Sequence, residues 1–352
     1  PPLGLPDVPR AEDNPTTSKK IALGRKLFFD RRLSKNGTMS CGMCHIPEQG
    51  FTNNELATPV GINGKSIRRN APTILNTAYL QRLFHDGRAE SLEAQAVLPL
   101  FTHDEMGNES EEEFIEKLSA LDDYQGLFEE AFGGRPSIER VGQALASWER
   151  TLLAANSPFD RWRFGGQQRA LDGAQQRGFE LFTGKARCVQ CHSLSSTNTL
   201  FTDHSFHDTG IGYLRHRRQR RTDGSVTIEI APGEFVSTDR EIVSQVEEPR
   251  PDDLGRYEIT KKPAHKWQYR TPSLRNVAVT APYMHDGSLP TLDAVVRHYN
   301  RGGAVHAGLD PLVQPLHLNK DEIGSLVAFL RSLTSSNLVE LIDDARTVSV
   351  GN

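Results

Sequence analysis

The sequence of 352 residues contains no run of about 18 apolar residues, so no segment is expected to cross a lipid bilayer. It also lacks a strong excess of charge: the net charge of −4 gives no electrostatic reason to expect nucleic-acid binding. The N-terminal stretch "PPLGLPDVPRAEDNPTT" has no basic segment followed by an apolar one. It is therefore expected to form an extended arm and to carry no export signal. The length predicts about two domains, at roughly 150 residues each.

Cysteine is scarce, and all four cysteines fall in two copies of one motif, "CGMCH" and "CVQCH". C-x-x-C-H is the attachment motif of c-type haem. Two thiols reach the two vinyl groups of the macrocycle, and the imidazole of the next residue reaches the iron. The residues predicted to hold two covalent haem c groups are Cys41, Cys44, His45, Cys188, Cys191 and His192.

A zinc site is the alternative for two C-x-x-C pairs, and it would need both pairs to close one tetrahedron. The pairs lie far apart in this sequence, and each carries its own histidine, which a redox dithiol does not need. The motif therefore favours haem. Because covalent haem attachment of this kind takes place outside the bacterial cytoplasm, a periplasmic location is expected.

The two haem segments belong to a longer internal repeat. "GRKLFF" precedes the first motif and "GFELF" the second, each typical of the packing face of a helix. Downstream, residues 68–99 and 269–299 share an arginine, then Pro-Thr or Pro-Ser, then His-Asp-Gly, then a leucine five residues after the glycine. Self-similarity of this kind indicates repeated structural units. We expect a mainly α-helical protein of two tandem cytochrome c-like domains, 1–160 and 161–352.

The repeat makes Pro99 and Tyr299 equivalent positions in the two domains. Leu92 aligns with Leu292, and Pro99 and Tyr299 each follow seven residues later. Neighbouring helix residues point about 100° apart, so His298 and Tyr299 cannot both face one iron. If this position lies over the haem, Tyr299 closes the second haem, whereas Pro99 leaves the first haem open to a small ligand. The alternative is that Tyr299 is an aromatic residue of the core.

Several motifs together resemble the di-haem cytochrome c peroxidase/MauG family over residues 17–335. They are the two C-x-x-C-H motifs, "NAPT", "HDGRA", "SPFDR", "TPSLRNVAVTAPYMHDG" and "HYN". The similarity is greatest to the MauG branch, whose second haem has a tyrosine ligand where the peroxidases have methionine. The resemblance implies that Tyr299 is that ligand and that the first haem has His45 alone.

The resemblance implies an enzyme that uses hydrogen peroxide to oxidise a tryptophan side chain of a partner protein, at a distance and through a state with both irons at Fe(IV). One alternative is a cytochrome c peroxidase that takes electrons from a small redox protein. The other is a di-haem electron carrier without enzymatic activity, which would need a second ligand over the first haem, such as His103.

The resemblance also assigns residues over the open haem. Gln95 is expected to hydrogen-bond the peroxide, Pro99 to line the pocket, and Glu105 to act as the general acid–base group. The alternative for Glu105, within "THDEMGNESEEE", is a solvated acid before a helix. A calcium ion between the haems is implied, held by the side chain of Asn70 and the backbone carbonyls of Thr280 and Pro282, with water completing the shell.

Two tryptophans of the family are missing here. The position before "DGRA" is His85, and the position two residues before the second motif is Ala186. The three tryptophans of this chain lie elsewhere, which puts the route of the electrons in doubt. "VGINGKSIRRN" (60–70) contains no histidine that could block the first haem. The open haem is therefore expected to react without reductive activation.

The remaining segments give local expectations. Helical periodicity covers 137–155 and 321–333, and 157–166 is interpreted as the hinge between domains. Residues 213–262 form a polar insertion in the second domain, with a strand at 225–230. The basic run 215–221 is interpreted as a solvated loop that could steer an acidic partner. His207 is placed near the second haem by analogy with the family, as a contact to the ligand or to a haem propionate.

Overall fold

The computed structural model describes residues 1–219, 224–231, 234–239, 242, 252–348 and 350. Its helices are α1 (Ser18–Phe29), α2 (Cys41–Cys44), α3 (Leu92–Phe101), α4 (Glu111–Ser119), α5 (Leu127–Phe132), α6 (Ile138–Glu149), α7 (Pro158–Arg163), α8 (Gly173–Thr183), α9 (Ile211–Gln219), α11 (Tyr257–Thr260), α12 (Leu292–Asn300), α13 (Lys320–Arg331) and α14 (Leu338–Arg346). The strands are β1 (Phe206–His207), β2 (Ser225–Ala231), β3 (Glu234–Asp239) and β4 (Tyr269–Arg270). The fold is mainly α-helical, as the sequence predicts. Among the described residues no helix has both the length and the apolar character needed to cross a membrane.

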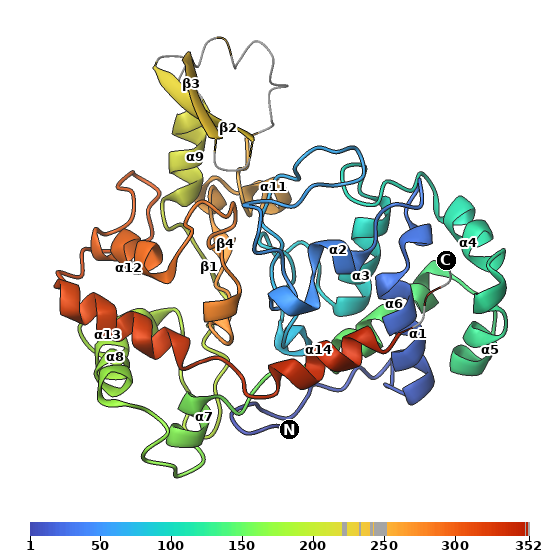
Figure 1. The fold of residues 1–352 in the computed structure, drawn as a ribbon, viewed down its shortest axis with the longest axis horizontal. Helices are drawn as coiled ribbons and strands as arrows, with labels where there is room; N and C mark the ends of the chain where they lie inside the picture. Colours follow the sequence, from blue (N-terminus) through green and yellow to red (C-terminus); the bar gives the residue numbers. More distant parts are fainter. Residues whose placement is uncertain (220–223, 232–233, 240–241, 243–251, 349, 351–352) are drawn as a thin grey trace.

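Each half of the molecule is built on one pair of crossing helices (Figure 1). In the first half α1 packs on α6, and in the second half α8 packs on α13. Both crossings pass over the glycine of the repeated Gly-x-x-Leu-Phe. A Cβ on Gly24 would lie 1.9 Å from the Ala144 oxygen, and one on Gly178 would lie 2.0 Å from the Ser325 oxygen. The helices could not approach so closely with any side chain there, which explains the glycine in both repeats.

A third helix completes each half. α3 packs on α6 and α12 packs on α13. Each begins at a hydroxyl cap: Ser91 accepts a hydrogen bond from Ala94 N, and Thr291 accepts one from Ala294 N. The predicted tandem repeat is therefore confirmed as two cytochrome c-like halves with equivalent helices.

The ends of the chain tie the halves together. The C-terminal helix α14 packs on the first core, where Ala345 is fully buried and Arg346 pairs with Glu48. The N-terminal arm is irregular, as expected, and its Gly4 oxygen accepts from Thr199 N in the second half. The division at residue 160 is a prediction, and each terminal segment contacts the half opposite to its place in the sequence.

Two helix predictions differ in accuracy. The expected helix at 321–333 corresponds to α13, whereas the one expected at 137–155 ends at Glu149. The chain leaves the helix because the Asn76 side chain binds the backbone of Ala154 twice. Its Nδ2 donates to the Ala154 oxygen and its Oδ1 accepts from Ala154 N, both at 2.9 Å.

The insertion contains more regular structure than the sequence indicates. The strand predicted at 225–230 is confirmed as β2, which pairs antiparallel with β3 in a hairpin that projects from the body (Figure 1). The interpretation of 215–221 as a loop is wrong for 215–219, which form the end of α9, whereas 220 and 221 lie outside the described residues. The helix is held by tertiary contacts: Arg215 donates to the Arg68 oxygen at 2.8 Å, and His216 Nδ1 lies 3.0 Å from an Asp252 oxygen.

The segment predicted as a hinge is a well-packed joint. α7 begins with a capping box in which Ser157 and Asp160 bind each other's backbone, and Phe159 is 1% exposed. Asp160 is fully buried and accepts two hydrogen bonds from Arg275, both at 2.9 Å. This buried ion pair connects the joint to the segment that leads to α12.

Replacing Asp160 by alanine should lower the free energy of unfolding by about 3–5 kcal/mol, because it leaves the Arg275 guanidinium buried without a counter-charge. Urea denaturation followed by circular dichroism would measure the loss. The matched control is Asp293→Ala, which removes an exposed ion pair to Arg297 and should leave the midpoint unchanged within error. Equal midpoints for the two variants would contradict a structural role for the buried pair.

Candidate active site

The first C-x-x-C-H motif lies on a short helix. α2 contains Cys41 and Cys44, and His45 follows as its C-cap residue. The His45 Nδ1 lies 3.3 Å from the Phe51 carbonyl oxygen. Because a carbonyl can only accept, Nδ1 carries the proton and Nε2 keeps its lone pair, which is the form that binds a metal. Phe51 has a left-handed backbone, with φ of 57°, which turns its oxygen towards the ring.

The second motif repeats this arrangement. The His192 Nδ1 lies 2.8 Å from the Phe201 oxygen, and Phe201 also has a left-handed backbone, with φ of 53°. The residue after each phenylalanine anchors the turn: Thr52 donates to the Ala71 oxygen, and Thr202 donates to the Thr271 oxygen. The structure therefore presents two equivalent imidazoles, each beside a pair of cysteines.

The predicted acid–base residue lies beside the first motif. Burial raises the pKa of the Cys41 and Cys44 thiols, and the charge of the nearby Glu105 adds to the effect on both. Burial, opposed by Arg88, raises the pKa of Glu105 above its ordinary value of 4.5. The other acids of the same stretch, such as Glu109, are exposed. Glu105 is therefore not the solvated acid that the alternative interpretation proposed.

A tight loop fixes the position of Glu105. Its carbonyl oxygen accepts from Ile62 N at 3.1 Å, and Glu105 N donates to the Thr102 oxygen at 2.9 Å. Gly61 packs flat on this loop, since a Cβ there would lie 1.6 Å from the Asp104 oxygen. The loop is thus clamped to the segment 60–70, in which the sequence lacks a blocking histidine.

Gln95 and Pro99 lie four residues apart on α3, so their side chains share one face of the helix. Among the described residues the Gln95 amide has no hydrogen-bond partner in the protein, and the proline side chain offers no donor atom. The neighbouring Leu98 is 41% exposed. In the repeat Val295 stands at the position of Gln95 on α12, so only the first half has a polar group there.

Tyr299 and His298 differ clearly in their contacts. His298 is 2% exposed and its Nε2 lies 2.9 Å from the Thr209 oxygen, so it is a satisfied core residue. No hydrogen bond holds the Tyr299 hydroxyl within the described part of the chain. Burial and the nearby Cys191 and Cys188 thiols raise the pKa of this phenol. The phenol therefore lies near the second cysteine pair, and its role as a haem ligand stays a prediction.

His85 and Asn70 meet between the halves. The His85 Nε2 donates to the Asn70 oxygen at 3.0 Å, and burial lowers the pKa of His85 to about 4. The Asn70 Nδ2 donates to the Ala57 oxygen at 2.9 Å, which leaves Oδ1 as the atom of that side chain without a protein partner in the described chain. The segment of Thr280 and Pro282 lies against the first half, where a Cβ on Gly50 would be 3.3 Å from Thr280 Cγ2.

His207 lies between two carboxylates. Its Nδ1 is 2.6 Å from Asp310 Oδ2 and its Nε2 is 2.8 Å from Asp203 Oδ2. The Cys191 sulfur, followed by Asp310 and Asp203, raises the pKa of His207 to about 10. With Cys191 in a thioether, only the two carboxylates would hold the imidazolium. Within the described ranges Cys191, Asp203 and His207 form the one cluster of metal-ligating side chains, and it is part of the second haem site.

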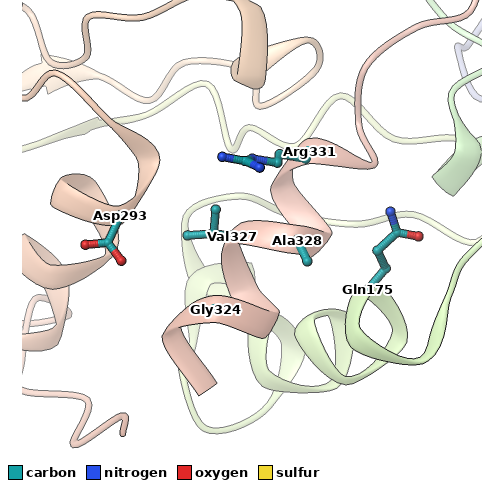
Figure 2. A pocket seen from close by; sticks show the side chains of 6 residues that line it. All are labelled: Gln175, Asp293, Gly324, Val327, Ala328 and Arg331. Atoms are coloured by element: carbon teal, nitrogen blue, oxygen red, sulfur yellow. The ribbon is translucent and has the colours of Figure 1, made fainter. Parts of the chain in front are cut away.

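A shallow pocket lies away from these residues, on the surface of α8, α12 and α13. Figure 2 shows its lining, which consists of Gln175, Asp293, Gly324, Val327, Ala328 and Arg331. Asp293 is occupied by Arg297, and none of the predicted site residues faces this pocket. It offers no acid–base pair for catalysis.

Comparisons with known proteins agree with this geometry. Residues 18–169 match the family described as di-haem cytochrome c peroxidase, and residues 268–304 match one described as RoxA-like, cytochrome c-like. The methylamine utilization protein MauG of Methylorubrum extorquens is 38% identical over 330 residues, which cover 93% of this chain and 81% of that protein. This chain belongs to the di-haem cytochrome c peroxidase family.

Two further relatives have different names. The cytochrome-c peroxidase IdrP1 of Denitromonas iodatirespirans is 36% identical over 350 residues, covering 95% of this chain and 86% of that protein. A MauG-like protein associated with microbial copper homeostasis has a similar structure, with a TM-score of 0.77, 30% identity and coverage of 96% and 95% of the two chains. The chain is thus a di-haem oxidoreductase, and its relatives include both MauG proteins and peroxidases.

The residues of this di-haem enzyme fit two haem c groups. None of the four cysteines is in a disulfide, and burial raises the pKa of the Cys44 and Cys188 thiols to about 12, so their surroundings disfavour a charge on sulfur. A thioether bond suits such an apolar site because it carries no charge. His45 and His192 have the tautomer that iron requires, so the donor set supplies two thioether positions and one imidazole to each haem.

Sequence reasoning missed Arg88. It lies close enough to Glu105 to lower the pKa of that carboxyl, against the larger effect of burial. Its guanidinium carbon is 3.4 Å from the Phe84 ring centroid, and it also binds Asp86. The repeat contains the signal, because the second half has Ser288 at this position. A cation appears only in the half that holds Glu105.

Proposed function

We propose that this enzyme uses hydrogen peroxide to oxidise an aromatic side chain, specifically a tryptophan, of a partner protein. The observation that supports this most is Tyr299, whose phenol has no hydrogen bond in the described protein and lies beside Cys188 and Cys191. A phenolate is a hard, anionic donor, and the axial ligand is a main determinant of haem potential. Ligation by Tyr299 would make the second haem a poor entry point for electrons from a cytochrome and a good store of oxidising power.

The residues of the first half handle the peroxide. Cys41, Cys44 and His45 would hold the haem, which would supply the redox chemistry for cleaving the O–O bond. Glu105 would act as the general acid–base group, taking a proton from one oxygen of the bound peroxide and returning it to the other, which leaves as water. Gln95 offers an amide that orients the peroxide, and Pro99 leaves that face without a competing ligand. The non-enzymatic alternative loses its candidate ligand, because the His103 side chain is 87% exposed and bonded to Asp104.

The proposal also includes a calcium ion between the haems, a cellular location and a division into two domains. Asn70 Oδ1 and the carbonyls of Thr280 and Pro282 supply only oxygen donors, which suit Ca²⁺ with added waters. We place the enzyme in the periplasm, where haem c proteins of bacteria are assembled, and we divide it at residue 160 into a peroxide-reactive domain and a closed-haem domain.

Cytochrome c peroxidase activity is the second candidate, and the similarity to IdrP1 over 95% of the chain supports it. In that case a small redox protein would deliver the electrons. The chemistry of Glu105 is the same in both functions. What differs is the source of the electrons, a carrier protein in one function and a side chain in the other.

Paired assays with equal peroxide distinguish the two functions. One assay supplies reduced cytochrome c or a reduced copper protein, and the other supplies the protein encoded by a neighbouring gene. We expect oxidation of tryptophan in the neighbour, measured as a mass change in its peptides, and slow oxidation of the carriers. The control is Glu105→Gln, which should lower both activities together. Rapid turnover of a carrier with unmodified peptides in the neighbour would assign this chain to the peroxidases.

A further inference from the structure

Three rings from distant parts of the chain form a cluster over the second half, which we call the ring stack. Tyr213 lies on α9, Trp267 precedes β4, and His306 follows α12. Tyr213 and His306 are stacked, with centroids 4.4 Å apart and planes 7° apart. Trp267 meets both edge-on, with its centroid 5.4 Å from each. Indole and phenol are the side chains that lose one electron most readily, so this is a continuous oxidisable unit.

Contacts connect the ring stack to the second haem site. The His306 Nε2 lies 2.9 Å from Asp208 Oδ2. The next residue, Thr209, accepts the His298 contact at 2.9 Å, and the His298 ring lies 5.5 Å from the Tyr299 ring. The path from Tyr299 to Trp267 therefore runs through packed side chains and one short piece of backbone. In Figure 1, α9 lies directly below the projecting hairpin, above and to the right of α12.

The other tryptophans do not offer such a route. Trp148 is fully buried in the first core, where its neighbours are Phe28 and Phe29. Trp162 packs on Phe159 and Phe179. Phenylalanine is far harder to oxidise than tyrosine, so these clusters do not extend a path.

Ala186 stands where the family resemblance places a surface tryptophan, and it is 3% exposed. Among the described residues, Trp267 is the tryptophan in ring contact with a tyrosine.

The surroundings of Trp267 suit transfer rather than storage of an oxidising equivalent. Its Nε1 is buried with no acceptor in the described protein, so the ring keeps its proton when it loses an electron. The Lys266 ammonium lies 4.3 Å from the indole centroid, and Arg217 lies 5.8 Å from the Tyr213 centroid. Both cations disfavour a positive charge on the rings. An oxidised Trp267 is therefore a strong oxidant that regains its electron quickly.

We propose that the ring stack is the exit through which the second haem site oxidises a partner protein, with Trp267 as the last relay. This rests on the proposed function. Per turnover, H₂O₂ accepts two electrons and two protons and becomes two molecules of water. The partner side chain supplies both electrons, one at a time, and both protons. Trp267 loses and regains one electron in each transfer and is unchanged at the end.

The rim of the stack also indicates the charge of the partner. Arg217 and Arg218 are exposed on α9, the helix that carries Tyr213, and Arg217 lies near the Tyr213 ring. Lys266 lies over the indole itself. A partner with acidic residues around its oxidised side chain would be attracted to this surface, and its binding would weaken as salt rises.

The test uses the enzyme with both haems attached and no partner. After peroxide is added, freeze-quenched samples containing ring-deuterated tryptophan are examined by electron paramagnetic resonance, and peptides are mapped by mass spectrometry. We expect a tryptophan radical and oxidation products at Trp267 and Tyr213. Trp267→Phe should abolish the radical and leave the rate of the initial reaction with peroxide unchanged. The matched control, Trp162→Phe, should retain both.

With the partner present, Trp267→Phe should slow oxidation of the partner by about tenfold or more, and Trp267→Tyr should recover part of the rate. Haem content and thermal midpoint verify that each variant is folded. If Trp267→Phe does not fold, Trp267→Tyr replaces it in the test. A radical that survives in Trp267→Phe, or oxidation confined to other residues, overturns the proposal. If the partner stays unmodified while the Trp267 radical still forms, the proposed substrate is wrong and the exit stands.

Discussion

Replacing Glu105 by glutamine is expected to slow the reaction with hydrogen peroxide by roughly 10²–10⁴-fold, while both haems stay attached. Glutamine preserves the size and the loop contacts of Glu105 but cannot take a proton. Stopped-flow absorption at equal peroxide would measure the rate. The matched control is Glu109→Gln, an exposed acid of the same stretch that pairs with Lys35. It should react as the wild type does.

The pH dependence follows from the position of Glu105. Burial raises the pKa of this carboxyl above 4.5, and only the carboxylate can accept the proton of the peroxide. The wild-type rate should therefore fall as the pH drops through the raised pKa, and it should be constant well above it. Glu105→Gln should lose this acidic limb. An unchanged rate and an unchanged pH profile in the variant would mean that another group moves the proton.

Much of the fold could be predicted because the repeat has a physical cause in each part. Gly24 and Gly178 allow two helices to touch, and Phe51 and Phe201 turn their carbonyls towards the two imidazoles. The first requirement leaves the fixed spacing Gly-x-x-Leu-Phe in both halves, whereas Phe51 and Phe201 stand six and nine residues after their histidines. The strand β2 could be predicted because its apolar and polar residues alternate, as they do in a half-exposed strand.

The rest depended on tertiary contacts that leave no local pattern. The basic end of α9 has too few apolar residues to show helical periodicity. The residues that hold this helix in place are distant from it in the sequence. Gly212 packs on Trp267, and Arg215 binds the backbone of Arg68. A charge run was therefore interpreted as a loop. The ring stack was missed for the same reason, because its three rings lie in separate segments.

For the candidate site, the sequence indicated which residues carry chemistry, and the structure showed their neighbours. The haem motifs are specific because each supplies three adjacent groups of the required kind. Glu105 could not be separated from its acidic neighbours by composition, since only burial distinguishes it. Arg88 could be found only by its proximity to Glu105. A role that depends on burial, on an electric field or on the distance between two side chains leaves no short sequence motif.

Replacing Tyr299 by methionine should raise the reduction potential of the second haem by roughly 200–400 mV, because axial ligands tune haem potentials over about 0.8 V. A thioether is a soft, neutral donor that stabilises Fe(II), whereas a phenolate stabilises the higher oxidation states. A spectroelectrochemical titration would measure the shift. The variant should accept electrons from reduced cytochrome c more readily and oxidise the partner protein less.

Two further variants decide whether Tyr299 is the ligand at all. The wild type should show one high-spin and one low-spin ferric haem by electron paramagnetic resonance. Tyr299→Phe removes the oxygen and keeps the ring, so the second haem should also become high-spin. His298→Gln changes the neighbouring residue, whose imidazole is already engaged with the Thr209 oxygen, and it should keep the low-spin signal. Two low-spin haems in the wild type would contradict an open first haem, because Pro99 has no donor atom and some other residue would then occupy the face that the peroxide needs. Loss of the low-spin signal in His298→Gln but not in Tyr299→Phe would assign the ligand to His298. The second haem would then have two neutral nitrogen ligands, and the case for oxidation at a distance would lose its physical basis.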